Sequence, residues 1–121
     1  MPVEVRLAVA AGGAVGTLLR LAVAEAFPVT AFPLATLFVN LVGAYLLGRL
    51  SGSMPDASPR VRAFVGTGIL GAFTTFAAVA VDVVALGHDP LLLVVYAMAT
   101  LAGGITVARL GARQGAMAML P

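Results

Sequence analysis

The chain has 121 residues, of which 61% are hydrophobic and only 10% are charged, and its mean hydropathy is +1.09. Soluble domains carry about 25% charged residues, so this composition excludes an ordinary soluble domain and predicts an all-α protein that crosses a membrane several times. The seven basic residues are scattered arginines, so the pI of about 9.9 does not indicate nucleic-acid binding, and the absence of cysteine excludes disulfides and thiolate metal sites.

The first predicted crossing covers residues 5–25. Its uncharged part, Leu7 to Leu19, has only thirteen residues, so the helix must also include Arg20. The long side chain of that arginine can reach the membrane interface or face protein. Gly12 and Gly16 form a GxxxG pattern, which is typical of membrane helices that pack closely. No cleavage pattern or soluble domain follows, so we interpret the segment as a membrane helix and not as a signal peptide.

The second predicted crossing covers residues 33–49 and carries one conspicuous polar side chain, Asn40, at mid-membrane depth. An asparagine in this position can hydrogen-bond to a neighbouring helix, or its amide can donate to an anion in a polar path. Position alone leaves both interpretations open. The clearly polar loop from Arg49 to Arg62 follows this crossing.

The third predicted crossing covers residues 62–86 and has helix-weakening and polar residues at its centre. Nineteen uncharged residues separate Arg62 from Asp82, with Gly71, Thr74 and Thr75 in the middle. This pattern predicts an unwound turn, which persists in a bilayer only where its free backbone groups are buried in protein, coordinate an ion or line a wet path. Glycine would make the turn sterically cheap. The alternative is a continuous helix in which the glycine packs and the threonines bond to their own helix.

Three glycines of this crossing, Gly66, Gly68 and Gly71, also match the G-x-G-x-x-G pattern of dinucleotide-binding proteins. That motif requires a preceding strand, a following helix in a soluble βαβ unit and an acidic residue about 20 positions further on. Here the glycines are flanked by apolar residues throughout, so we discard a dinucleotide site.

The fourth predicted crossing covers residues 90–110 and follows a short turn that contains His88. We interpret His88 as a solvated turn residue and not as a metal ligand. Within the crossing, Tyr96, Thr100 and Gly104 are spaced by four residues and share one helix face. Their two hydroxyls indicate a polar track, and the alternative for Tyr96 is an anchor at the membrane interface.

Four crossings in a single transmembrane domain, residues 1–121, place both termini on one side. Six of the seven arginines lie on that side: Arg6, Arg49, Arg60, Arg62, Arg109 and Arg113. Only Arg20 lies toward the opposite side. The positive-inside rule therefore predicts a multi-pass protein of a prokaryotic inner membrane with cytoplasmic termini. Four crossings are too few to enclose a pore easily, so we expect an oligomer.

Three segments resemble the CrcB/Fluc family of fluoride channels: GGAVGTLLR from Gly12 to Arg20, TLFVNLVGAYLLG from Thr36 to Gly48, and GILGAFTTFAAV from Gly68 to Val79. The resemblance covers essentially the whole chain. It implies an antiparallel dimer with two narrow fluoride paths, and a passive channel rather than an enzyme. Such a channel would export fluoride that enters the cell as neutral HF.

The resemblance also implies the site residues. Asn40 looks like the pore asparagine of the family, and Phe76 looks like the first of its two pore phenylalanines. The expected ion pathway comprises Asn40, Phe76, Thr75, Tyr96, Thr100 and Arg20. The family's structural Na⁺ on the dimer axis would be held by the backbone carbonyls of Gly71 and Thr74. Asp82 occupies a place where family members often have an acidic residue.

The chain departs from the family pattern at residues 76–79, where Phe-Ala-Ala-Val replaces Phe-Ser-Thr-Phe. One phenyl ring and two hydroxyls are missing. This departure and the arginine bias both favour a heterodimer with an inverted, related subunit that supplies the missing groups.

Three alternatives to a heterodimeric channel stay open. They are a homodimeric dual-topology channel, a non-conducting structural subunit and a small proton-coupled multidrug exporter. The exporter would need a carboxylate embedded in the membrane. Glu4 lies at the terminus, and Glu25 and Asp82 lie near helix ends, so the sequence argues against an exporter.

Overall fold

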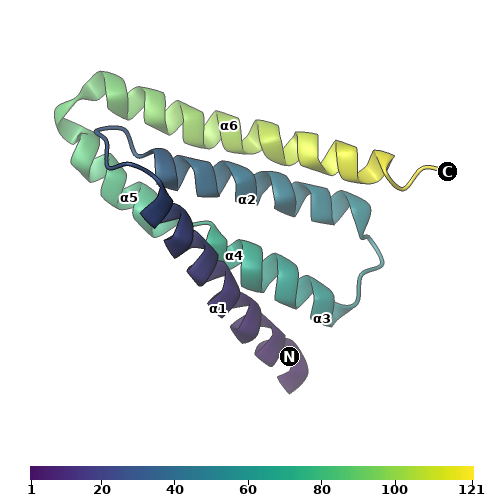
Figure 1. The fold of residues 1–121 in the computed structure, drawn as a ribbon. Coiled ribbons are helices and arrows are strands. Elements are labelled where there is room, and N and C mark those ends of the chain that lie inside the picture. Colours follow the sequence, from purple (N-terminus) through teal and green to yellow (C-terminus); the bar gives the residue numbers. More distant parts are fainter.

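The computed structural model describes Met1 to Pro121 and contains helices and no strands. Four helical rods make up the chain (Figure 1): α1 (Val3–Ala26), α2 (Leu34–Ser53), a third rod (Pro59–His88) and α6 (Pro90–Met117). Each rod is long enough and apolar enough to cross a membrane. The prediction of an all-α membrane protein is confirmed, and the rods contain the expected crossings almost entirely.

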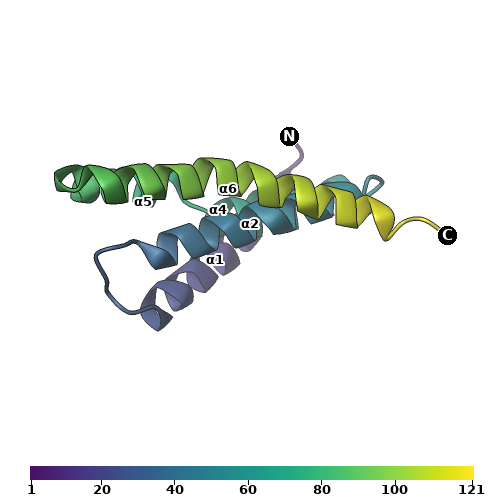
Figure 2. The ribbon, with the colours of Figure 1, turned by 90° about the horizontal axis from the view of Figure 1, so that it is seen from above.

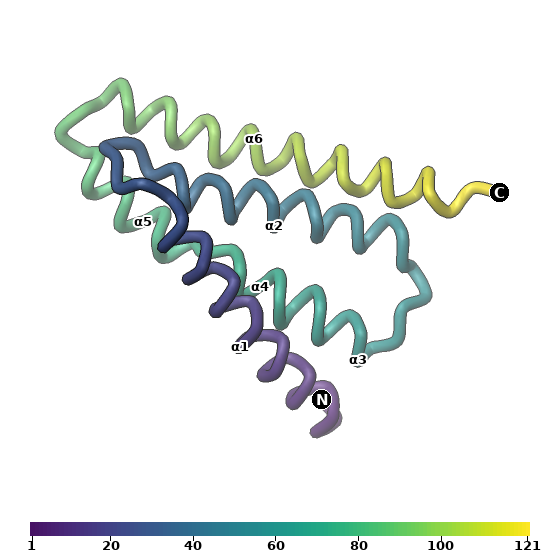
Figure 3. The backbone as a smooth tube through the Cα atoms, viewed as in Figure 1, coloured from purple at the N-terminus to yellow at the C-terminus, as the bar shows by residue number.

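The third rod is broken at its centre, as the tube in Figure 3 shows between α4 and α5. Its parts are α3 (Pro59–Val61), the π-helical η1 (Arg62–Leu70), α4 (Gly71–Phe73), α5 (Phe76–Ala85) and the 3₁₀ turn η2 (Leu86–His88). Thr74 and Thr75 lie between α4 and α5 in extended conformations, with ψ angles of 156° and 121°. The predicted break is confirmed, and the alternative of a continuous helix is wrong.

Gly71 plays a different part from the one expected. It is helical, with φ −65° and ψ −34°, and no glycine in the chain has a positive φ. The expectation that Gly71 makes the turn sterically cheap is therefore wrong, because extended threonines form the turn. A Cβ at this position would meet only the Gly66 carbonyl, at an ordinary 3.7 Å. Neither conformation nor packing within the chain requires a glycine here.

Side-chain caps fix the starts of the later helices. The Thr75 hydroxyl accepts from the Ala78 N–H at 3.1 Å and so begins α5. An Asp89 carboxylate oxygen accepts from the Leu92 N–H at 3.1 Å and begins α6, with Pro90 in the first helical position. These bonds satisfy helix N–H groups that have no partner within the helix. The break is therefore also a defined helix start.

α2 and α6 lie side by side through small residues (Figures 1 and 2). A Cβ added at any of four glycines would overlap a backbone carbonyl of the other helix. The pairs are Gly48 with Ala108, Gly52 with Ala112, Gly111 with Tyr45, and Gly115 with Arg49. The Tyr45 hydroxyl also donates to Gln114 Oε1 at 2.5 Å. Close backbone approach thus joins these helices.

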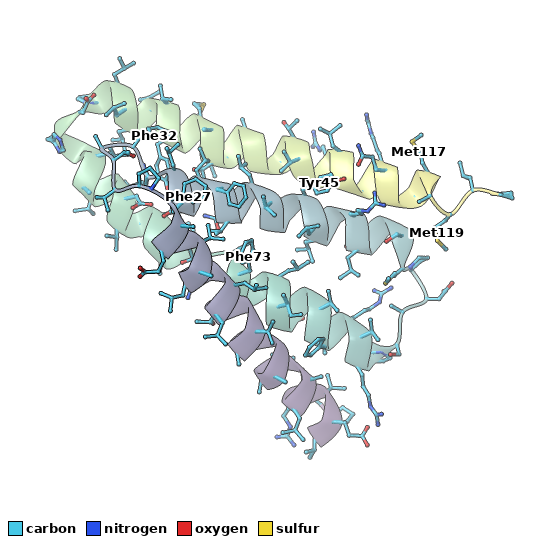
Figure 4. All side chains as sticks on the ribbon, in the orientation of Figure 1. Phe27, Phe32, Tyr45, Phe73, Met117 and Met119 are labelled. Atoms are coloured by element: carbon cyan, nitrogen blue, oxygen red, sulfur yellow. The ribbon has the colours of Figure 1, made fainter.

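α1 packs in the same manner against the first half of the third rod. Gly12 lies against the Phe64 carbonyl and Gly16 against the Ile69 carbonyl, while a Cβ at Gly13 would meet nothing within 4 Å. The GxxxG prediction is confirmed for the two buried glycines. Phe73, which is 8% exposed, lies where α1 crosses the rod (Figure 4).

Both termini and the loop before α3 lie at one end of the bundle, and the other two connections lie at the opposite end (Figure 1). At the terminal end, the Arg60 guanidinium pairs with the Glu4 carboxylate. Only 12 of the 121 residues are buried, so most apolar side chains point outward. This outward apolar surface is what a lipid bilayer or a second subunit would cover.

Candidate functional site

A cleft of about 720 Å³ lies beside the break, between α2, the third rod and α6. We call it the central cleft. It brings together six predicted site residues: Asn40, Gly71, Thr74, Thr75, Phe76 and Thr100. Its other lining residues are apolar or glycine, and none carries a charge. The cleft is therefore a polar strip in an apolar wall.

Asn40 is bonded to the break itself. Its Nδ2 donates to the Thr75 carbonyl at 3.0 Å, and its Oδ1 accepts from the Thr75 N–H at 2.8 Å. The first of the two interpretations of Asn40 is thus confirmed, because the side chain does hydrogen-bond to another helix. A carboxamide has two N–H donors, so one stays uncommitted beside the cleft.

The two threonines of the break have different hydrogen-bonding states. The Thr74 hydroxyl donates back to the Leu70 carbonyl at 3.0 Å, which uses its proton within the helix. The Thr75 hydroxyl accepts from Ala78 and makes no donor bond of its own. Of these two hydroxyls, Thr75 is therefore the one with a proton to offer.

The remaining wall of the cleft contains one further hydroxyl and one exposed ring. The Thr100 hydroxyl oxygen is buried without a hydrogen-bond partner. Phe76 is 84% exposed, so its ring packs against almost nothing in this chain. Val79, where the resemblance implies a second phenylalanine, lines the same cleft. A phenyl ring at position 79 would therefore lie on this wall.

A second cleft, of about 450 Å³, lies between α1, α2 and the start of α5. It contains Arg20, which makes no ion pair or hydrogen bond in the subunit, together with Thr17, Thr36 and Thr75. Arg20 therefore lines an open cleft of the protein and is half-buried. Ala77 and Ala78, where the resemblance implies two hydroxyl residues, line this second cleft and not the central one.

Tyr96 lines neither cleft, but its hydroxyl lies beside Thr100 of the central cleft and Thr36 of the second cleft. It is fully buried, and its hydroxyl donates to an Asp82 carboxylate oxygen at 2.8 Å. Its ring meets Phe32 edge-on, with the ring centroids 5.7 Å apart. The bond joins α5 to α6 and uses the hydroxyl proton, so Tyr96 has no hydrogen-bond donor to offer an ion. Its full burial excludes the role of an exposed interfacial anchor in the isolated chain.

Sequence reasoning missed two features of this region. The Asp82 bond to Tyr96 joins residues fourteen positions apart, and no local pattern reports it. Thr36 was not singled out, although it lies in the second cleft and beside the Tyr96 hydroxyl. A signal for Thr36 was present, since it precedes Asn40 by four residues and shares its helix face.

The chain matches the family described as CrcB-like protein, Camphor Resistance (CrcB), over residues 7–112. It is 46% identical over 103 residues to a protein of Halobacterium salinarum named fluoride-specific ion channel FluC 1, covering 83% of this chain and 85% of that protein. It is 39% identical over 122 residues to fluoride-specific ion channel FluC of Thermus thermophilus, covering 95% and 96%.

A third relative, fluoride-specific ion channel FluC of Idiomarina loihiensis, is 46% identical over 90 residues and covers 70% of each chain. The region matched by the family, residues 7–112, includes all of α2 and the third rod, most of α1 and α6, and the residues that line both clefts. The relatives are named as ion channels and not as enzymes. On these matches, the chain belongs to the CrcB-like family.

Proposed function

We propose that the chain is a subunit of a passive, fluoride-selective channel that lets fluoride leave the cytoplasm of a prokaryotic cell. The observation that carries the proposal is the central cleft, which gathers Asn40, Thr75, Phe76 and Thr100 without a charged residue, in a chain of this family. The absence of a carboxylate from the lining removes a group that would repel an anion or carry protons in exchange.

The donors in the cleft suit a small, strongly hydrated anion. An ion that leaves water needs replacement hydrogen bonds within the protein. Three donors are uncommitted: one N–H of Asn40, the Thr75 hydroxyl and the Thr100 hydroxyl. The edge of the Phe76 ring is electropositive and offers a further contact. Arg20, in the neighbouring cleft, adds a positive charge on the same subunit.

Fluoride flux through the reconstituted protein, with any partner it requires, tests this proposal. Liposomes that contain it should release fluoride and retain chloride without an imposed proton gradient, because the cleft has no proton-carrying group. A fluoride electrode and a chloride electrode measure the two fluxes, and protein-free liposomes are the control. Proton-coupled efflux of an organic cation, without fluoride flux, would instead support the exporter.

We also propose a structural Na⁺ at the break, held by the carbonyls of Gly71 and Thr74 from each of two antiparallel subunits. The break supports this because the Gly71 carbonyl can accept only a long, shared contact of 3.5 Å from the Thr74 hydroxyl, which donates mainly to Leu70 at 3.0 Å. The Thr75 N–H, which a continuous helix would turn to that carbonyl, donates to Asn40. Free carbonyl oxygens suit a hard cation, and the ion would supply a fixed positive charge at the break. Gly71 is exposed on the subunit surface, where a second copy could approach.

Sodium should stabilise the dimer selectively. A ligand bound only by the folded dimer at about 100 times its Kd adds about 2.7 kcal/mol of stability. We therefore expect the melting temperature in detergent to rise with NaCl and to stay lower in N-methylglucamine chloride at equal ionic strength. Equal melting temperatures in the two salts, or a density map with no ion on the dimer axis, would contradict the site.

For the assembly, we propose a heterodimer with an inverted relative. The departure at Val79 and the arginine bias support it, and a dual-topology homodimer and a non-conducting subunit are the alternatives. In this arrangement the termini of this chain face the cytoplasm. A partner that carries the missing phenylalanine would complete one of the two pores.

A further inference from the structure

Asn40 and the Thr75 peptide form a two-bond pair. The break separates the Thr75 N–H and carbonyl from the regular bonding of a helix, and both are paired with the Asn40 carboxamide, at 2.8 and 3.0 Å. A side-chain amide has the same donor and acceptor as a peptide group, so it can replace both lost bonds at once. Within a bilayer, no water is present to hydrogen-bond a backbone N–H or carbonyl that has lost its partner.

The pair also fixes one helix against another. Asn40 lies in α2, 35 residues before Thr75, and the part of α2 that follows it, from Tyr45 onward, is held by the tight glycine contacts with α6. Gly43, one turn later in α2, lies against the Thr74 side chain. The Thr75 peptide is therefore bonded to α2, whereas Thr74 is bonded to its own helix through the Leu70 carbonyl.

We propose that Asn40 is the positioning residue of the break. By holding the Thr75 peptide in its extended conformation, it aims the carbonyls of Gly71 and Thr74 out of the helix and keeps the Thr75 hydroxyl at the start of α5. One amide hydrogen of Asn40 stays free on the central cleft, so the same side chain holds the break and offers a donor. The transport readout of this proposal rests on the proposed function, but the structural readout does not.

Hydrogen exchange at the Thr75 amide tests the pair directly, because Thr75 lines both clefts and water that enters them can reach it. Asn40→Ala removes both bonds and should raise the exchange rate of this amide on the order of tenfold or more. Asn40→Asp keeps an oxygen acceptor for the Thr75 N–H, so exchange should stay close to that of the natural chain. Thr106→Ala is the control, because its hydroxyl bonds only to the Ala102 carbonyl of its own helix.

Sodium dependence supplies the second readout. If Asn40 aims the carbonyls, the Na⁺ concentration that gives half of the maximal rise in melting temperature should be on the order of tenfold higher in Asn40→Ala than in the natural chain. In Thr106→Ala this concentration should be unchanged. Should the alanine variant fail to fold, Asn40→Ser carries both readouts, since its short side chain cannot make the two bonds together.

The outcomes separate this proposal from the channel itself. Unchanged Thr75 exchange and unchanged sodium dependence in Asn40→Ala, with fluoride flux alone reduced, would overturn the positioning role and leave Asn40 as a pore donor. Increased Thr75 exchange in a protein whose natural form conducts no fluoride would support the positioning role and overturn the channel.

Discussion

Replacing Gly12 with leucine is expected to separate α1 from the third rod, whereas the same change at Gly13 should leave the fold intact. The two glycines are neighbours in one helix, so helix propensity and hydropathy change equally in both variants. They differ in their surroundings: a Cβ at Gly12 overlaps the Phe64 carbonyl, and a Cβ at Gly13 meets nothing within 4 Å. The comparison therefore isolates close helix packing.

The expected loss at Gly12 is large because the obstacle is backbone. Extra methylenes in a packed interior typically cost about 1–3 kcal/mol when side chains can shift. Here the opposing atoms are the Phe64 carbonyl oxygen and the Gly68 Cα, which cannot move without moving the whole rod. We expect a cost of about 3 kcal/mol or more, a large part of the about 5–15 kcal/mol that stabilises a typical protein.

The yield of monodisperse protein in detergent and its melting temperature measure this effect. Gly12→Leu should give aggregate or a much lower melting temperature, and Gly13→Leu should match the natural chain. Helix content by circular dichroism checks that each variant was inserted as helix. Equal losses at the two positions would contradict the packing explanation.

The elements of the fold could be predicted because hydropathy and glycine spacing are local properties. The four rods follow from apolar runs, and Gly12 with Gly16 pack as their spacing indicates. The break was also predictable in position, since small and polar residues interrupt an apolar run. Its conformation was not, because Gly71 stays helical and Thr74 and Thr75 are extended. Which residue leaves the helical conformation depends on the group that hydrogen-bonds to its freed backbone N–H and carbonyl. Here that group is a side chain on another helix.

The site was predicted less completely than the fold. Asn40, Thr75, Phe76 and Thr100 were named from the family pattern, and the fold brings them to one cleft. The hydrogen-bonding state of each was beyond sequence, because it depends on contacts between helices. Tyr96 shows this best: its spacing with Thr100 suggested a shared polar track, yet its proton is used on Asp82.

Expressed alone in a fluoride-sensitive strain, the chain is expected to fail to confer resistance, and co-expression with an oppositely biased relative should restore it. An antiparallel pair needs one subunit with its termini inside and one with its termini outside. Six arginines lie at the terminal end of the bundle and one, Arg20, lies in the other half of α1. This bias should give nearly every copy the same orientation in the membrane. Copies of this chain alone would therefore seldom meet a copy of the opposite orientation with which to dimerise.

Orientation and pore chemistry can be tested separately with variants of this chain. Arg109 and Arg113 are exposed and make no ion pair or hydrogen bond in the subunit, and exposed His88 lies in the turn at the opposite end. A variant with Arg109→Gln, Arg113→Gln and His88→Arg lowers the bias without breaking a bond in the structure. Tags on the termini should then appear on both sides of the membrane, and should appear on one side for the natural chain.

If orientation alone prevents function, the charge variant should confer resistance without a partner. If the missing ring also matters, resistance should require Val79→Phe in addition, because Val79 lines the central cleft beside the break. Val79→Phe without the charge changes should confer none, since the copies would still share one orientation. Resistance from the charge variant, whether alone or only together with Val79→Phe, supports a chain that depends on an inverted partner. Robust resistance from the natural chain alone, with its termini found on both sides of the membrane, would overturn the heterodimer and identify an ordinary dual-topology channel.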